Sequence, residues 1–216
     1  MIKSKSTRAR RRPRPPQGSS RERILAAALE VFAEQGFDGA RTRDIAERAG
    51  ANLGLIDYYF EGKEKLWRAA VASAFEELQR ELGAAVAPAP GGAEAGERAR
   101  LEQLLRRFVH FVARRPAFMR LMNDEGKRDG PRMRWLADHH VRPLSEALRR
   151  LVEAAQAHGQ LPALPPLSVH YIALGAAGLV FSQAAECRYL TGVDPTDERF
   201  AEAHADALVR LLLGPG

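Results

Sequence analysis

The sequence is poor in the features that would cross-link a chain or place it in a membrane. It contains one cysteine, Cys187, which cannot form a disulfide within the chain, so a reducing compartment is the simplest setting. No apolar run approaches the roughly 18 residues that a membrane-spanning helix needs. The first residues are polar and basic and lack the apolar segment of a secretory signal. We therefore expect a cytoplasmic protein with no membrane partner.

Recognisable catalytic and metal-binding patterns are also missing. The chain contains no G-x-S-x-G, no H-E-x-x-H and no glycine-rich loop that would cradle a phosphate. His139 and His140 are adjacent, so on a helix their side chains would point about 100° apart, and a single cysteine cannot make a thiolate site. We expect no catalytic residue, no metal site and no cofactor, and therefore a protein that is not an enzyme.

Acidic residues are absent from the first 17 positions, which carry seven lysines and arginines and three prolines. Removing these seven from the 33 basic residues of the chain leaves 26, against 27 acidic residues, so the positive charge belongs to the arm alone. We expect residues 1–18 to be a disordered basic arm that favours a polyanion, with nucleic acid ahead of an acidic membrane surface. A leader that only improves solubility is the alternative.

The sequence has no alternating pattern that would form a β-strand, whereas apolar spacing of three and four is widespread. Ser19 and Glu22 form a capping box for a first helix, which we expect Gly36 to end. Pro143 either kinks its helix or starts a new one, and residues 87–96 read as a loop. The predicted fold is all-α, with about nine helices. The later helices are expected over 42–49, 53–60, 63–86, 97–115, 116–126, 131–159 and 168–191, and in a last segment that Asp194 and Pro195 cap and that ends near Leu213.

Residues 42–60 combine two short helices with a tight turn. Thr42 is positioned to cap the first helix, Gly50 to end it in the left-handed conformation, and Asn52 to cap the second. Two such helices, braced by a preceding one, describe a helix-turn-helix, whose second helix presents its N-terminal residues to base edges in the DNA major groove. A plain three-helix packing unit with surface tyrosines is the alternative.

The spacing along residues 53–60 separates an inner from an outer face. Ile56 and Phe60 lie four apart and should face the core. The side chains expected to point outward are Asn52, Leu53, Leu55 and Tyr58. The tyrosine hydroxyls suit phosphate contacts, and the helix starts at Thr42 and Lys63 favour phosphate as well.

The segment ILAAALEVFAEQGFDGARTRDIAERAGANLGLIDYYFEGKEKLW closely resembles the N-terminal DNA-binding domain of the TetR-type transcriptional repressors. The likeness extends over residues 22–67 and includes the spacing of Ala-Leu-x-x-Phe, Gly-Phe, Thr-x-x-Asp-Ile-Ala-x-x-Ala-Gly and Tyr-Phe-x-x-Lys-Glu. It implies a sequence-specific DNA-binding regulator, and in that family the rest of the chain binds an effector and forms the dimer.

By this resemblance Thr42 and Lys63 match phosphate contacts, and Tyr58 and Tyr59 match an aromatic pair on the DNA backbone. Two positions depart from the family. Leu53 stands where lysine is frequent and can only touch a thymine methyl or pack. Asp57 stands where tyrosine is frequent, and its carboxylate should turn aside, accept from a donor or contact a cytosine amine. The DNA-binding residues that we expect are Thr42, Arg43, Asn52, Leu53, Gly54, Tyr58, Tyr59 and Lys63.

Residues 97–190 are rich in apolar and aromatic side chains with scattered polar ones. Met119 and Met122, three apart beside Asn123, are the favoured cavity residues because thioethers adapt to varied apolar ligands. We expect a small apolar or aromatic effector with a polar handle, although any one of the candidates is more often ordinary core. The candidate ligand-binding residues are Phe108, Phe111, Phe118, Met119, Met122, Asn123, Trp135, His139, Tyr171 and Phe181.

Three small residues, Ala173, Ala177 and Gly178, lie close to one face of the most apolar helix. Small side chains let two helices approach closely, so this face could pack on a second copy of the chain, or it could be an ordinary buried contact within one chain. The family resemblance also implies dimerisation, and we expect these residues at the dimer interface.

The expected organisation is an arm over residues 1–18, a helix-turn-helix domain over 19–66 and a ligand-binding and dimerisation domain over 67–216. The expected function is a ligand-responsive repressor, acting as a homodimer on a near-palindromic operator in double-stranded DNA. An activator, or a DNA-binding regulator without an inducer, is the alternative.

Overall fold

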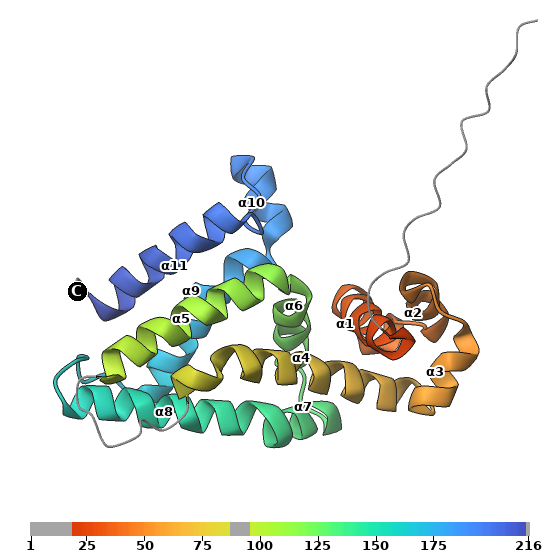
Figure 1. Ribbon diagram of the computed structural model, residues 1–216, viewed down its shortest axis with the longest axis horizontal. Helices are drawn as coiled ribbons and strands as arrows, with labels where there is room; N and C mark the ends of the chain where they lie inside the picture. Colours follow the sequence, from red (N-terminus) through yellow and green to blue (C-terminus); the bar gives the residue numbers. More distant parts are fainter. Residues whose placement is uncertain (1–18, 87–95, 215–216) are drawn as a thin grey trace, which may run out of the picture.

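The computed structural model describes residues 19–86 and 96–214 (Figure 1). The expected basic arm and nearly all of the expected loop at 87–96 lie outside these residues. The described part of the chain is helical without a strand, which confirms the all-α prediction. Its helices are α1 (Ser20–Gly39), α2 (Thr42–Ala49), α3 (Leu53–Phe60), α4 (Lys63–Val86), α5 (Glu97–Arg114), α6 (Pro116–Glu125), α7 (Pro131–Leu136), the π-helical turn η2 (Ala137–Val141), α8 (Arg142–Ala157), α9 (Pro166–Ser182), α10 (Ala184–Thr191) and α11 (Glu198–Leu213).

Residues 19–86 and 96–214 form eleven α-helices where about nine were expected, because two of the expected helices are each divided. The segment 131–159 is interrupted by η2, and Pro143 lies in the first turn of α8, where a missing N–H costs nothing. The segment 168–191 breaks at Gln183, and α9 and α10 meet at a bend of 68°. No single described helix is long and apolar enough to cross a membrane, and only this bent pair meets the combined criteria of length and composition.

Helix α1 begins as the sequence predicts. The Ser19 hydroxyl accepts from the Glu22 backbone N–H at 3.2 Å, and the Glu22 carboxylate accepts from the Ser19 N–H at 2.8 Å. Gly36, with φ 69°, interrupts the helix, although one further helical turn carries α1 to Gly39. This turn places Phe37 where it can contact the second domain, as described below.

The last helix starts later than expected. Asp197 is the N-cap of α11 and accepts from the Arg199 N–H at 2.8 Å. Asp194 instead accepts from the Thr196 N–H at 3.0 Å and closes a local turn ahead of the helix. The expectation that Asp194 and Pro195 cap α11 is therefore wrong, while the predicted end at Leu213 is confirmed.

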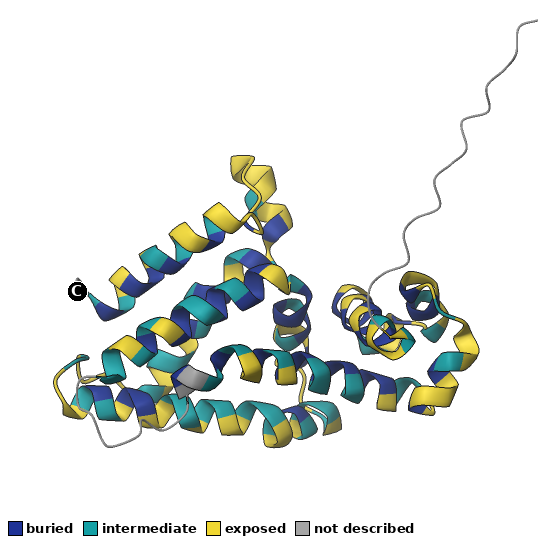
Figure 2. Ribbon diagram, in the orientation of Figure 1, coloured by how far each residue is buried: buried dark blue, intermediate teal, exposed yellow. Residues whose placement is uncertain are grey.

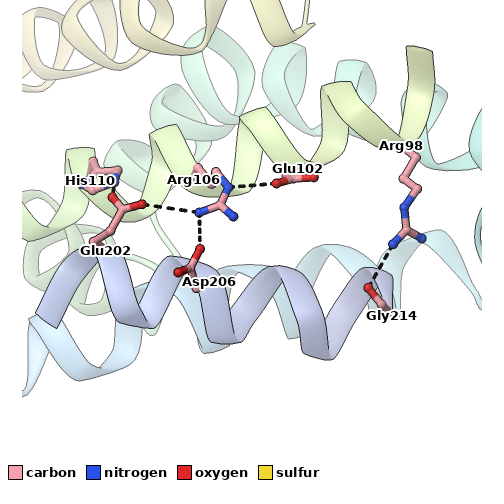
Figure 3. A network of polar contacts seen from close by, with 7 residues as sticks. All are labelled: Arg98, Glu102, Arg106, His110, Glu202, Asp206 and Gly214. Atoms are coloured by element: carbon pink, nitrogen blue, oxygen red, sulfur yellow. Dashed lines mark hydrogen bonds and ion pairs between the residues drawn. The ribbon is translucent and has the colours of Figure 1, made fainter. Parts of the chain in front are cut away.

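Helices α5 and α11 pack side by side and are joined by polar contacts along their length (Figure 3). Arg106 of α5 contacts Glu102 at 3.0 Å, Asp206 at 2.6 Å and Glu202 at 3.6 Å. At the far end of the same face the Arg98 guanidinium donates to the Gly214 carbonyl at 2.9 Å. These contacts fix the C-terminal helix to the wall of the second domain.

The chain divides into a small N-terminal cluster, α1 to α3, and a larger group of helices, with α4 running between them (Figure 1). Buried residues line the inner faces of α4 and α5, and exposed residues dominate α10 (Figure 2). The two groups also touch directly where α6 packs against α1. Any movement of α4 or α6 therefore acts on the N-terminal cluster.

Candidate nucleic-acid interface and cavity

The turn between α2 and α3 is built from local hydrogen bonds. Gly50 ends α2 with φ 59° and ψ 39°, a left-handed conformation that glycine adopts at little cost. The Ala51 N–H donates to the Ala46 carbonyl at 2.9 Å, and the Arg23 guanidinium of α1 donates to the Ala49 carbonyl at 3.2 Å. Arg48 of α2 makes two contacts of 2.8 and 2.7 Å with the Glu34 carboxylate of α1. These contacts fix the end of α2 and hold α2 against α1.

The start of α3 is capped and open to approach. The Asn52 side chain is the N-cap, as predicted, and accepts from the Gly54 N–H at 2.9 Å. Asn52, Leu53 and Gly54 are all exposed. A Cβ added at Gly54 would meet only the Asn52 side-chain oxygen, at 3.5 Å, so the glycine is not required by packing within the chain. Its lack of a side chain leaves a flat surface at the helix start.

The two faces of α3 separate nearly as expected. Ile56 and Phe60 are buried, and Tyr58 is 78 % exposed, with its ring in edge contact with that of Tyr59 at 5.2 Å. Leu55 differs from the expectation, because it is partly buried against the core. The exposed face is therefore carried by Leu53, Asp57 and the two tyrosines.

The flanking helix starts present the other predicted residues. Arg41, not Thr42, is the N-cap of α2, so Thr42 is the first helical residue and the exposed Arg43 follows it. Lys63 begins α4, and its ammonium group lies 3.2 Å from the Asp38 carbonyl and 4.8 Å from the centre of the Phe37 ring. A phosphate contact by Lys63 would therefore start from a side chain that is already positioned.

Asp57 is exposed, and its carboxylate has no hydrogen-bond or ion-pair partner among the described residues. The nearby Lys65 pairs instead with Glu61 at 2.6 Å. Of the three outcomes expected for Asp57, acceptance from a donor within the chain is not found in the described structure. That the Asp57 carboxylate contacts a cytosine amine, or that it turns away from phosphate, remains a prediction.

The second domain contains a partly open cavity of about 510 Å³. Helices α4, α5, α6, α8 and α9 supply its walls, which are mostly leucine, phenylalanine and methionine. A cavity of this size matches the clefts of roughly 300–1,000 Å³ that bind small molecules. Six of the predicted ligand-binding residues line it: Phe108, Phe118, Met119, Met122, Asn123 and Tyr171.

Four predicted ligand-binding residues do not line this cavity. Phe111 is buried against Phe118 with their ring centres 5.2 Å apart and does not itself line the cavity. Phe181 is buried against the His204 ring of α11 at 5.6 Å. Trp135 and His139 stack on each other at 5.2 Å, and the His139 ring donates to the Trp135 carbonyl at 2.8 Å. These four residues make aromatic contacts within the chain and are not part of this cavity lining.

Sequence reasoning missed much of the cavity wall. Phe75, Leu78 and Leu82 line the cavity from α4, in which no ligand-binding residue was predicted. Val141, Leu144 and Leu148 line it from η2 and α8. Their spacing of three and four along α4 and α8 is the signal that could have identified them, although the same spacing describes any buried helix face.

A polar contact joins the cavity region to the N-terminal cluster. Glu125, at the end of α6, is buried, and its carboxylate lies 3.3 Å from the Arg132 guanidinium. Arg132 in turn lies over the Phe37 ring at 4.1 Å, on the same ring that Lys63 contacts. Three contacts therefore join the end of the cavity-lining helix α6 to the start of α4.

The small residues expected at the dimer interface are packed within the chain. Ala173, Ala177 and Gly178 are all buried. A Cβ added at Gly178 would lie 2.5 Å from the Met119 terminal carbon, so Met119 of α6 occupies this face. The close helix approach that the sequence indicates is thus made within the chain, and the sequence alone does not show whether the partner helix belongs to the same chain.

No group of three or more histidine, cysteine, aspartate or glutamate side chains in residues 19–86 and 96–214 is arranged to hold a metal ion. Burial lowers the pKa of His140, and the neighbouring His139 lowers it further. The His140 ring stacks on Phe75 at 4.8 Å, which places a neutral imidazole beside the cavity wall.

Two family matches cover most of the described chain. Residues 24–70 match the family described as "Bacterial regulatory proteins, tetR family", and residues 98–212 match "Tetracyclin repressor-like, C-terminal domain". The second match alone spans more than half of the 216 residues. The chain belongs to the TetR family of regulators. It is therefore a DNA-binding transcriptional regulator and not an enzyme, as its sequence predicts.

Individual relatives agree with this assignment. The chain is 34 % identical over 151 residues to the HTH-type transcriptional repressor NicS of Pseudomonas putida, a match that covers 65 % of each protein. A probable HTH-type transcriptional regulator of Bacillus subtilis, YttP, is 34 % identical over 64 residues. That match covers 30 % of this chain and 31 % of YttP. The chain thus spans just under two thirds of the first relative and about a third of the second.

Solved structures share the fold over nearly the whole chain. AibR, solved in complex with isovaleryl coenzyme A and operator DNA, aligns with a TM-score of 0.72 at 17 % identity, covering 92 % of this chain and 100 % of AibR. A TetR/AcrR-family transcriptional regulator from Thermobifida fusca aligns with a TM-score of 0.60 at 26 % identity. That alignment covers 89 % of this chain and 96 % of the other.

Proposed function

We propose that this TetR-family regulator is a ligand-responsive repressor that acts as a homodimer on a near-palindromic operator. Each subunit would insert the start of α3 into the major groove, and the two-fold axis of the dimer would set the spacing of the half-sites. Asn52, Leu53 and Gly54 would approach base edges, while Tyr58, Tyr59 and Lys63 would contact phosphates. The exposure of this surface and the rigid turn behind it support these roles.

The observation that carries the proposal is the continuity of α4. This single helix of 24 residues begins at Lys63, beside the candidate DNA surface, and its later turns line the cavity with Phe75, Leu78 and Leu82. Because a helix transmits displacement along its axis, a ligand that moves these side chains also moves the helix start. The separation of the two α3 helices in a dimer would change, and both half-sites would no longer fit at once.

The contact through Glu125 and Arg132 supplies a second connection. Arg132 packs on Phe37 beside Lys63, and Glu125 ends the helix that carries Met119 and Met122 of the cavity wall. A ligand that shifts α6 would therefore also shift the Phe37 contact. A ligand works in this way only through a difference in its affinity for the two arrangements.

The dimer is supported by apolar side chains that one chain leaves exposed. Leu167, Tyr171, Ile172 and Leu179 are exposed on α9, and Leu211 is exposed on α11. An apolar patch of this kind is typical of an interface between proteins. Ala173, Ala177 and Gly178 are buried within the chain whereas these side chains are exposed, so we place the interface at the exposed side chains and not at the small residues.

The effector would be a small apolar or aromatic compound with a polar handle, as the cavity lining indicates. AibR was solved with both a ligand and operator DNA, so the shared fold accommodates the two kinds of partner in that protein.

The test combines DNA and ligand measurements on the full chain. Footprinting of the DNA upstream of its own gene would define the operator, and sedimentation would give the oligomeric state. The proposal predicts a dimer whose specific complex is released by a ligand from an apolar compound screen. Ile172→Glu should give a monomer with weakened operator binding, whereas Ala185→Glu, a substitution at an exposed residue on α10, should leave the dimer intact. A dimeric Ile172→Glu variant would contradict the proposed interface, and a complex that no cavity ligand releases would contradict the inducer.

A further inference from the structure

The charged groups that line the cavity have one sign. Among the lining residues that the structure describes there is no aspartate or glutamate, and the Lys127 ammonium is the one full charge. The other polar side chains, Asn123, Ser145, His170 and Tyr171, carry neutral groups. Burial lowers the pKa of His170, so its ring stays neutral near pH 7. A buried charge needs an opposite charge, so this lining opposes an organic cation and accommodates an anion.

The lysine stands at one end of the cavity. Asn123 and Lys127 belong to the last turn of α6 and the turn after it, while Leu104 and Leu105 line the cavity from the first half of α5. Figure 1 shows α6 beside the end of α5, away from the start of α5 and the last turns of α4. The charge of Lys127 therefore lies at the α6 side of the cavity, whereas Leu104 and Leu105 line it from the first half of α5.

A second, smaller cavity extends the apolar end. It has a volume of about 80 Å³ and is lined by apolar side chains throughout, including Leu101, Val152 and Leu161. Leu104, Leu105, Leu148 and Ala173 line both cavities and so form the wall between them. An apolar chain that runs from Lys127 toward Leu104 and Leu105 would reach this wall.

Lys127 is available to a ligand. Its ammonium group contacts the Asp124 carboxylate at 3.1 Å, and both side chains are at least half exposed. An exposed ion pair of this kind contributes little, so a ligand anion can compete for the ammonium. Asp124 does not line the cavity, and its charge weakens the site without occupying it.

We propose that the cavity binds an elongated amphiphile with one anionic head, of the class of straight-chain carboxylates, with the head at Lys127 and Asn123 and the chain directed toward Leu104 and Leu105. This assignment rests on the proposed function in which the cavity is the effector site. It replaces a general apolar effector by one of defined charge and shape.

The first experiment measures binding to the full chain by calorimetry. The ligands are octanoate, decanoate, dodecanoate and tetradecanoate, each below its micelle concentration, together with the matching alcohols and alkyltrimethylammonium ions. Carboxylate affinity should rise about fourfold per added methylene until the space is filled. Carboxylates should bind more tightly than alcohols, and the cations should bind worst. Equal binding of all three head groups, or preference for the cation, would overturn the proposal.

Charge variants assign the head group to its place. Lys127→Gln should weaken carboxylates about fivefold and leave the alcohols unchanged, and Asp124→Asn should strengthen carboxylates. Arg134→Gln is the matched control, because Arg134 is an exposed cation outside the cavity lining. An equal loss in Lys127→Gln and Arg134→Gln would show a general charge effect and overturn the assigned head position.

A filling variant tests the direction of the chain. Ala173→Leu places a larger side chain in the wall between the cavities and should weaken tetradecanoate more than octanoate. Equal weakening would overturn the assigned direction. If no carboxylate binds while the protein still binds its operator and another ligand releases it, the ligand class is wrong and the proposed function stands. If operator binding itself is absent, the proposed function fails first.

Discussion

In the N-terminal cluster, Ile24, Ile45 and Ile56 come from three different helices and are completely buried, whereas in the second domain Leu105 and Phe118 face a cavity of about 510 Å³. Protein interiors are normally packed as densely as organic crystals. The N-terminal cluster shows this dense packing, whereas the interior of the second domain contains unfilled space. The first arrangement holds a rigid surface for DNA. The second leaves space that a ligand can fill, and α4 connects the two.

The strongest test of this difference uses one substitution in two places. Leu25 and Leu105 are both helical leucines with 5 % exposure, but only Leu105 lines the cavity. We expect Leu25→Ala to lower the free energy of unfolding by about 4 kcal/mol and Leu105→Ala by about 2 kcal/mol, within the known range for such truncations. A side chain beside a void has fewer contacts to lose. Urea unfolding followed by circular dichroism measures both values, and equal losses would remove the contrast.

Substitutions at the start of α3 should change operator affinity through the shape of the exposed surface and should leave the packing of the fold unchanged. Gly54→Arg should weaken specific operator binding by about 3 kcal/mol, because base contacts worth about 1–3 kcal/mol each are displaced. Gly54→Ala should cost less, since its Cβ would meet only Asn52 within the chain. Thermal melting should show that both variants fold. Normal operator affinity in Gly54→Arg, measured by fluorescence anisotropy, would mean that α3 does not enter the groove.

The cavity side should also respond to pH. Burial lowers the pKa of His140 from its ordinary value of 6.5, so on acidification the unfolded chain takes up this proton before the folded chain does. Stability should therefore fall as the pH drops below about 6.5, by up to about 1.4 kcal/mol per pH unit for this group. His140→Phe keeps the stacking on Phe75 and should reduce this slope. Urea unfolding at neutral pH and about one unit below 6.5 makes the comparison, and an unchanged slope would exclude His140 as its source.

The smallest effect concerns one hydroxyl on the DNA surface. Tyr58→Phe should weaken binding by about 1 kcal/mol through loss of a phosphate hydrogen bond. Because phosphates carry no sequence information, operator and unrelated DNA should be affected alike. A loss confined to the operator would move Tyr58 from phosphate to base contact.

The contrast between the N-terminal cluster and the second domain also explains which features could be predicted from the sequence. The capping box at Ser19, the left-handed Gly50 and the Asn52 cap are set by neighbours within a few residues, and all three are found. Phe108 and Phe111 lie three apart on α5, yet only Phe108 lines the cavity, because that depends on how α5 is rotated against its neighbours. Gly178 signalled a close helix contact, but nothing local identified Met119 as the partner.

The predicted boundaries of two helices were wrong for a similar reason. Both Asp194 and Asp197 can cap a helix, and the packing of α11 on α5 decides that Asp197 does so. The break at Gln183 has no glycine or proline to announce it, and α9 and α10 read as one apolar helix.

If the proposed function is right, occupation of the cavity moves α4 and lowers operator affinity. This expectation is tested by measuring two affinities with one cavity ligand: that of the protein for labelled operator with and without saturating ligand, and that of the ligand with and without operator. Linkage requires the two affinities to change by the same factor. We expect the affinity for operator and the affinity for the ligand each to decrease at least tenfold. Operator affinity that is unchanged while calorimetry shows the cavity occupied would contradict it.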